Sequence, residues 1–101
     1  MPANSKQDAQ LMLANVPREY VFWFSDGRSL ANMAELAEAL RTISDETFAY
    51  HVNAEKNDFS AWVKDIIKDE KLANDLKKAT TKRQAVTRVT ERINTLKRNI
   101  G

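Results

Sequence analysis

Residues 51–62 read HVNAEKNDFSAW, and this stretch decides how the middle of the chain folds. It holds the only histidine, His51, and two asparagines, whose side chains favour helix ends because they bond free backbone groups. Two large aromatic residues then follow at helical spacing. The stretch therefore predicts the end of one helix, a connection over residues 53–57, and a second helix capped by Asp58 or Asn57.

Apolar residues repeat with helical spacing on both sides of this stretch. Residues 29–43 place leucine, methionine, alanine and isoleucine on one face, with Ser29 as the expected N-cap. A shorter helix begins at Ser44 or the aspartate after it, and another begins after Asp69. The last helix opens at Thr81, and its apolar residues recur at intervals of three and four.

One segment departs from this helical pattern. Residues 20–24 read YVFWF and precede an Asp-Gly turn, which predicts a buried extended segment. It is the only strand candidate in the sequence, so it pairs either within the molecule or with another molecule. Side chains alternate along an extended segment, so we expect Phe22 and Phe24 to point one way and Val21 and Trp23 the other.

These patterns predict a mainly α fold, a compact bundle of four to five helices with one short aromatic extended segment near the N-terminus. Residues 1–17 are expected to form a flexible N-terminal arm, and residues 18–101 a single helical domain. Residues 81–100 are its amphipathic terminal helix. The chain has 101 residues, of which 43% are apolar and 30% charged, a balance typical of one globular domain.

The amino-acid composition argues against cysteine-based sites and against a membrane-spanning segment. Cysteine is absent, so the chain has no disulfide, no thiolate nucleophile and no zinc–thiolate site. No stretch approaches the roughly 18 apolar residues of a membrane span, and the N-terminal residues lack the apolar run of a secretory signal. We therefore expect a cytoplasmic protein with no membrane partner, cofactor, metal or small-molecule substrate.

His51 is the one candidate for acid–base chemistry. Asp58 could orient it as a catalytic base, since such bases are normally held by a partner group. Alternatively, His51 packs at a helix end and bonds a neighbouring group. A metal site needs several ligands, and the carboxylates follow no recognised ligand spacing. We favour the structural role and predict that the protein is not an enzyme.

The terminal helix supplies the leading functional hypothesis. Its apolar seam is typical of paired helices, and it contains Val86, Val89, Ile93 and Leu96. The chain also has a strand candidate without an evident partner and no catalytic constellation. We therefore predict a non-enzymatic protein-interaction module that binds a protein partner or self-associates through these four residues.

The distribution of charge supplies the alternative. Residues 1–63 carry 5 basic and 9 acidic side chains, whereas residues 64–101 carry 11 basic and 5 acidic ones. Four basic residues of the terminal helix can neutralise the phosphates of a nucleic acid: Lys82, Arg83, Arg88 and Arg92. No aromatic residue accompanies them to stack on bases, and a solvated basic face is the simpler interpretation.

Four segments in succession form one recognisable pattern: FWFSDGRSL, LAEAL, DETFAYHVNAEKNDFSAWVKDII and LANDL. An aromatic extended segment with an Asp-Gly turn is followed by an H-V-N…N-D-F-S-x-W-V block. In this the chain resembles a family of small archaeal and bacterial domains of unknown function. The resemblance covers roughly residues 20–77, and residues 1–17 and the last helix lie outside it. It implies one mainly helical domain, and it implies no activity, cofactor or catalytic residue.

Overall fold

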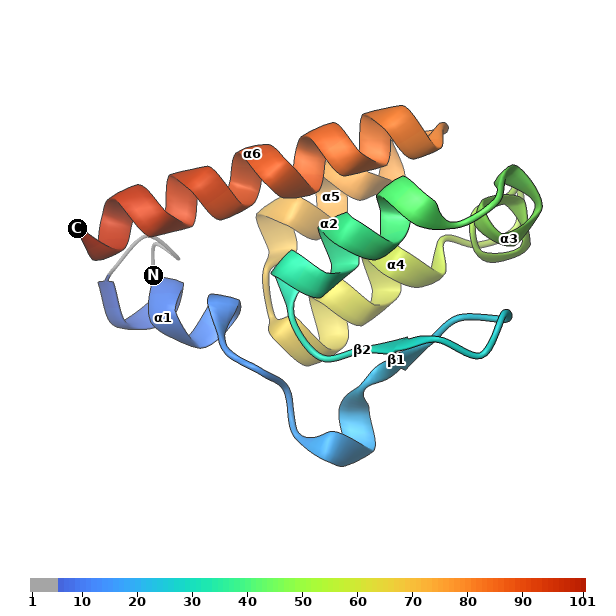
Figure 1. The fold of residues 1–101 in the computed structure, drawn as a ribbon. Helices are drawn as coiled ribbons and strands as arrows, with labels where there is room; N and C mark the ends of the chain where they lie inside the picture. Colours follow the sequence, from blue (N-terminus) through green and yellow to red (C-terminus); the bar gives the residue numbers. More distant parts are fainter. Residues whose placement is uncertain (1–5) are drawn as a thin grey trace.

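The computed structural model describes residues 6–101, which form a mainly α-helical domain (Figure 1). In chain order its elements are α1 (Lys6–Leu13), the 3₁₀ turn η1 (Arg18–Tyr20), β1 (Phe22–Trp23), β2 (Ser29–Leu30), α2 (Met33–Thr42), α3 (Asp45–His51), α4 (Asp58–Trp62), the π-helical turn η2 (Val63–Ile67), α5 (Glu70–Lys77) and α6 (Lys82–Ile100). The predicted mainly α fold is confirmed. Residues 6–101 contain six α-helices rather than four or five.

The longest helix, α6, organises the core. It runs along α2, and α1 and α5 also pack against it (Figure 1). The covered side of α6 carries Val89, Ile93 and Leu96, all of which are buried. They join one continuous apolar core with residues of the other helices and of the hairpin.

The predicted interaction seam is therefore part of the monomer core. Val89, Ile93 and Leu96 are buried, and Val86 is partly buried against the same core. A three-four apolar repeat shows that one side of a helix is covered, but it does not show which chain supplies the cover. Here the cover comes from helices of the same chain, so these side chains are unavailable to a partner in this structure.

The first described helix, α1, replaces much of the predicted flexible arm. Ala9 and Met12 are buried, and α1 packs against α6. After α1, the Val16 N–H donates to the Ala31 carbonyl at 2.8 Å, which ties this part of the chain to the hairpin. The expectation of an arm is therefore wrong for residues 6–17, and residues 1–5 lie outside the described residues.

The aromatic segment pairs within the molecule. β1 and β2 form an antiparallel hairpin in which Phe22 lies opposite Leu30 and Trp23 opposite Ser29. The predicted alternation is confirmed, because Phe22 and Phe24 are buried whereas Trp23 is 64% exposed. The expectation of a single strand candidate is wrong, because two residues assigned to the following helix form the partner strand.

Side-chain caps begin most of the helices. In each case a side-chain oxygen accepts the backbone N–H three residues on, as N-cap residues do: Asn32 for α2, Ser44 for α3, Asn57 for α4, Asp69 for α5 and Thr81 for α6. The caps predicted at Ser44, Asp69 and Thr81 are confirmed. Asn57 rather than Asp58 caps α4, and Asn32 rather than Ser29 caps α2, because Ser29 belongs to β2.

The connection between α4 and α5 brings a carboxylate into the interior. The chain passes through η2 and reverses at Lys68, whose φ of 70° makes it the one non-glycine residue with positive φ in the described part of the chain. A side chain in this left-handed region is strained. The reversal places the next residue, Asp69, at the start of α5 with no exposed surface.

We expect the double substitution Val89→Asp and Ile93→Asp to unfold the domain rather than to dissociate an assembly. Burying an unpaired carboxylate costs several kcal/mol, and two such costs are comparable with the ~5–15 kcal/mol that stabilise a typical domain. Circular dichroism and size-exclusion chromatography would show loss of helix and of compactness.

The matched control places the same two charges on the exposed side of α6, with Thr87→Asp and Asn94→Asp. This variant should stay folded. A folded Val89→Asp/Ile93→Asp protein that had lost only self-association would contradict the placement of the seam in the core.

Candidate functional site

His51 lies in the interior, and both of its ring nitrogens bond to the protein. Its Nε2 accepts the backbone N–H of Ser25 at 3.0 Å, and its Nδ1 lies 2.9 Å from Oδ2 of Asp58. A backbone N–H can only donate, so Nε2 carries no proton and Nδ1–H donates to the Asp58 carboxylate. The His51 side chain therefore joins the hairpin turn to α3 and α4.

Aromatic rings surround His51 on several sides. The centroids of Phe22, Phe24, Tyr50 and Phe59 all lie between 5.0 and 5.7 Å from the centroid of the imidazole. The nitrogen that a general base would use is bonded to a backbone amide, and the residue is 4% exposed. The geometry thus supports the structural role for His51. The prediction that the protein is not an enzyme stays a prediction.

Asp58 is the charged member of this cluster. Partial burial raises the pKa of its carboxyl, but the hydrogen bonds from His51 and from Lys56 outweigh that effect. The pKa therefore lies below its ordinary value of 3.8. The Lys56 ammonium lies 3.0 Å from the same Oδ2, so Asp58 stays ionised at neutral pH and holds the Nδ1–H of His51.

A second buried polar pair joins α5 to α6. The Nε–H of Arg92 donates to Oδ2 of Asp69 at 2.8 Å, and the two side chains are 8% and 0% exposed. The other oxygen of Asp69 accepts the Leu72 N–H at 3.1 Å. One carboxylate therefore caps α5 and also holds an arginine of α6.

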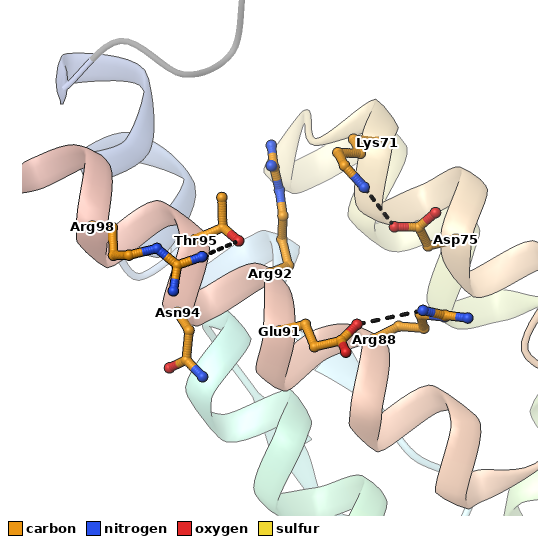
Figure 2. Close-up of a pocket in the computed structure, with 8 residues that line it drawn as sticks. All are labelled: Lys71, Asp75, Arg88, Glu91, Arg92, Asn94, Thr95 and Arg98. Atoms are coloured by element: carbon orange, nitrogen blue, oxygen red, sulfur yellow. Dashed lines mark hydrogen bonds and ion pairs between the residues drawn. The ribbon is translucent and has the colours of Figure 1, made fainter.

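Arg92 also lines a groove of about 450 Å³ between α5 and α6 (Figure 2). The groove is polar and mixed in charge, and its lining comprises Lys71, Asp75, Arg88, Glu91, Arg92, Asn94, Thr95 and Arg98. Lys71 pairs with Asp75 at 3.0 Å, and Arg88 pairs with Glu91 at 3.4 Å. Four cations and two carboxylates thus meet at one surface.

Two smaller hollows continue from this groove along α6. Arg88 lines both the groove and a hollow of about 240 Å³, which Arg83 also lines. Arg83 in turn lines a hollow of about 310 Å³ between α2 and α6, whose lining includes Leu40 and Val86. Together the three depressions gather the basic belt, which we define as Arg41, Lys71, Lys82, Arg83, Arg88, Arg92 and Arg98.

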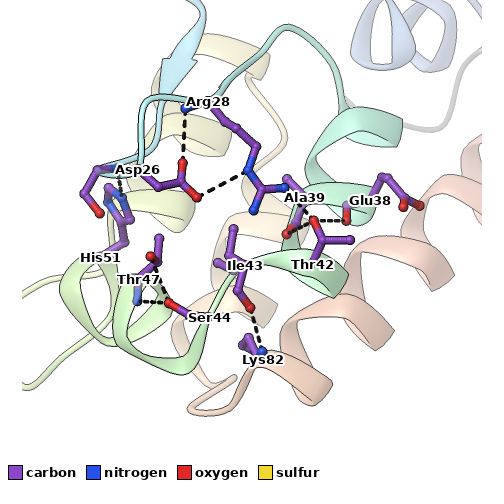
Figure 3. A network of polar contacts seen from close by, with 11 residues as sticks. Asp26, Arg28, Glu38, Ala39, Thr42, Ile43, Ser44, Thr47, His51 and Lys82 are labelled. Atoms are coloured by element: carbon purple, nitrogen blue, oxygen red, sulfur yellow. Dashed lines mark hydrogen bonds and ion pairs between the residues drawn. The ribbon is translucent and has the colours of Figure 1, made fainter.

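The four residues predicted to contact nucleic acid do not share one exposed face. Arg92 is buried in its pair with Asp69. Lys82 donates to the Ile43 carbonyl at 2.7 Å (Figure 3) and lies 3.3 Å from Asp45. Arg83 and Arg88 are exposed. The expectation that Arg92 forms part of an exposed basic face is wrong, because the carboxylate that it pairs with comes from α5.

Sequence reasoning also missed two cations of the groove, Lys71 and Arg98. Arg98 lies six residues after Arg92 on α6, a spacing that puts the two side chains roughly 120° apart around the helix axis, so helical spacing alone does not group them. Lys71 comes from α5, and its position depends on how α5 packs against α6. No pattern in the sequence indicates that packing.

No group of three or more histidine, cysteine, aspartate or glutamate side chains that could hold a metal occurs within residues 6–101. Within the same residues, no helix combines the length and the apolar character needed to cross a membrane.

The model of the family of unknown function DUF5752 matches residues 6–98, which is almost the whole chain. The chain belongs to this family. The DUF5752 match includes α1 and nearly all of α6, so the expectation that the N-terminal residues and the last helix lie outside the family is wrong for residues 6–17 and for residues 81–98. No curated protein and no solved structure matches the chain.

We expect the stability of this DUF5752 domain to depend on Asp58 in acid. Because the pKa of Asp58 is lower in the folded state than in the unfolded state, its contribution is present above the unfolded value, about pH 4, and is lost as the pH falls through the folded pKa. The stability difference between the wild type and Asp58→Asn should therefore stay constant above about pH 5 and shrink as the pH falls below about 4. Urea unfolding followed by circular dichroism at several pH values measures this.

Asp65→Asn is the matched control, since Asp65 is an exposed aspartate of η2. Its stability difference from the wild type should change little over the same range. An equal pH dependence for the two variants would contradict the role of Asp58.

Proposed function

We propose that this DUF5752 domain is a non-enzymatic protein-interaction module that binds an acidic segment of a partner protein along the basic belt. The supporting observation is the chain of three adjoining depressions beside α6, whose lining holds seven cations and two carboxylates. The proposed interaction therefore uses the depressions beside α6 rather than its buried apolar seam.

Two features favour a protein segment over a nucleic acid. The carboxylates of Asp75 and Glu91 lie among the cations of the groove, and they would repel a phosphate backbone, which is charged at every unit, more than a peptide whose acidic side chains can be spaced around them. No aromatic side chain lines any of the three depressions, so bases would have no stacking surface. The carboxylates can instead accept the backbone N–H groups of a bound peptide.

The hollow between α2 and α6 adds an apolar element. Leu40 and Val86 contribute to its lining, and Arg41, Lys82 and Arg83 surround them. An acidic segment that also carries an apolar side chain fits this combination, because the side chain can cover Val86 while carboxylates meet the cations. Of the four seam residues predicted to contact a partner, only Val86 is therefore available to do so, because it alone is only partly buried.

Nucleic acid is the alternative occupant, and the length of the basic belt supports it. Lys82 and Arg98 are separated by about 24 Å at 1.5 Å per helical residue, which matches roughly seven phosphates of one strand at 3.4 Å each. Binding of this kind would weaken steeply with salt and depend little on base sequence.

Fluorescence anisotropy with a labelled peptide tests the proposal. The probe is a twelve-residue segment rich in glutamate with two leucines, compared with single-stranded DNA, duplex DNA and RNA at about 50 and 150 mM salt. We expect saturable peptide binding that persists at the higher salt. The double charge reversal Arg83→Glu and Arg88→Glu should weaken it roughly tenfold or more.

The control reverses two exposed cations outside the basic belt, Arg18→Glu and Lys64→Glu, and so changes net charge equally. It should retain most of the affinity. Equal losses of peptide affinity in the two variants would show that net charge alone causes the effect, and would contradict binding at the basic belt. Tight nucleic-acid binding at 150 mM salt with no peptide binding would instead favour the alternative.

A further inference from the structure

Arg92 has hydrogen-bonding capacity that the fold leaves unused. A guanidinium carries five N–H donors, and only the Nε–H is bonded, to Asp69. None of the residues 6–101 accepts from the four N–H groups on Nη1 and Nη2. Both nitrogens are also in contact with solvent. Among residues 6–101, Thr90 Oγ1 is the one side-chain nitrogen or oxygen that is buried and has no hydrogen-bond partner, so the unbonded Nη1 and Nη2 of Arg92 are not buried. They therefore open into the groove that Arg92 lines.

The position of this guanidinium is fixed before any ligand arrives. Asp69 has no exposed surface, and both of its oxygens are engaged, one by Arg92 and one by the Leu72 N–H. Figure 2 shows Arg92 extending from α6 into the space beside Lys71 of α5. A fixed arginine loses little conformational entropy when it binds, and its paired N–H groups match the two oxygens of an oxyanion.

Thr95 adds a neutral donor to the same groove. Its hydroxyl oxygen accepts from Nη2 of Arg98 at 3.3 Å, so its own hydrogen stays free to donate (Figure 2). This contact holds Arg98 beside the groove, about 1.7 turns from Arg92 on α6.

The charges of the site select the kind of oxyanion. The lining supplies four cations and two carboxylates, and Asp69 behind Arg92 supplies a third carboxylate. One positive charge therefore remains. It balances a singly charged carboxylate, whereas a phosphate monoester carries about −1.5 to −2 at neutral pH and would leave an excess of negative charge.

We infer that the groove between α5 and α6 is a carboxylate-binding subsite with Arg92 as its fixed donor. The inference rests on the proposed function, in which the carboxylate is an aspartate or glutamate side chain of the bound acidic segment. In addition, Arg92 binds this one side chain at a defined position through hydrogen bonds, whereas the other cations of the basic belt attract the segment through charge alone.

An NMR titration with sodium acetate tests the subsite, with sodium chloride exchanged to keep the ionic strength constant. The Nε–Hε signal of Arg92 and the backbone amides of Asn94 and Thr95 should shift together and saturate, with a Kd on the order of millimolar to tens of millimolar. Inorganic phosphate at the same ionic strength should shift them less. Absence of saturable shifts with acetate would overturn the subsite, and tighter binding of phosphate would overturn its assignment to carboxylates.

Variants separate the subsite from general attraction. Arg92→Lys should abolish the saturable shifts. Because that change can also disturb the buried pair with Asp69, Arg98→Gln carries the test independently, since Arg98 is exposed. It should weaken acetate about fivefold, while Lys64→Gln, outside the groove, should leave the Kd unchanged. An unchanged Kd in Arg98→Gln would contradict the subsite.

Failure of the subsite and failure of the proposed function give different results. If the acidic peptide binds with dependence on Arg83 and Arg88 but acetate does not bind, only the subsite is lost. If acetate binds at Arg92 but the peptide does not bind the domain, the subsite stands and the proposed partner is wrong.

Discussion

The ion pair between Asp69 and Arg92 is the interaction on which the arrangement of the C-terminal half depends. Removing one partner of a buried pair leaves an uncompensated charge and typically costs about 3–5 kcal/mol, a large share of the stability of a small domain. Asp69 also caps α5, so the same carboxylate sets where α5 begins and where α6 lies against it. Arg92, held by this pair, also lines the groove between the two helices.

The N-terminal half depends on a different kind of connection. The hairpin has only two short strands and is too small to be stable alone. It is held by single hydrogen bonds from large buried rings: His51 accepts from Ser25, and the indole of Trp62 donates to the Tyr20 carbonyl at 2.8 Å. Phe22 and Phe24 then pack among those rings. Aromatic burial and a few long-range hydrogen bonds, these two among them, thus hold the hairpin in place of a longer sheet.

Local features of this fold could be predicted from the sequence, because their causes lie within a few residues. The caps at Ser44, Asp69 and Thr81 and the alternation of Phe22 and Trp23 depend on short-range geometry. The hairpin partner was missed because Leu30 also fits the apolar period of the helix that follows and Ser29 also fits the role of its N-cap. The helix α1 was missed because its buried residues, Ala9 and Met12, are few and lie among polar ones.

The site was harder to predict because it depends on contacts between distant segments. An arginine on an exposed-looking face of α6 became buried because Asp69, 23 residues earlier in the chain, reaches it. The apolar seam was recognised, but periodicity carries no information about which helix covers it. The same limit applies to Lys71, which enters the groove only through the packing of α5. The sequence showed that residues 64–101 are basic, but it did not show which of these basic side chains form ion pairs and which stay exposed and unpaired.

The two tryptophans of this domain occupy opposite environments, and this gives the protein a built-in optical reporter. Trp62 is buried and its indole nitrogen is hydrogen-bonded, whereas Trp23 projects from the hairpin and is 64% exposed. Their emission should therefore differ in wavelength, with Trp23 contributing the red-shifted, readily quenched component. Without Trp23, the remaining signal would come from the indole that holds the Tyr20 carbonyl. Its wavelength would then follow the docking of the hairpin onto the helices directly, with no added label.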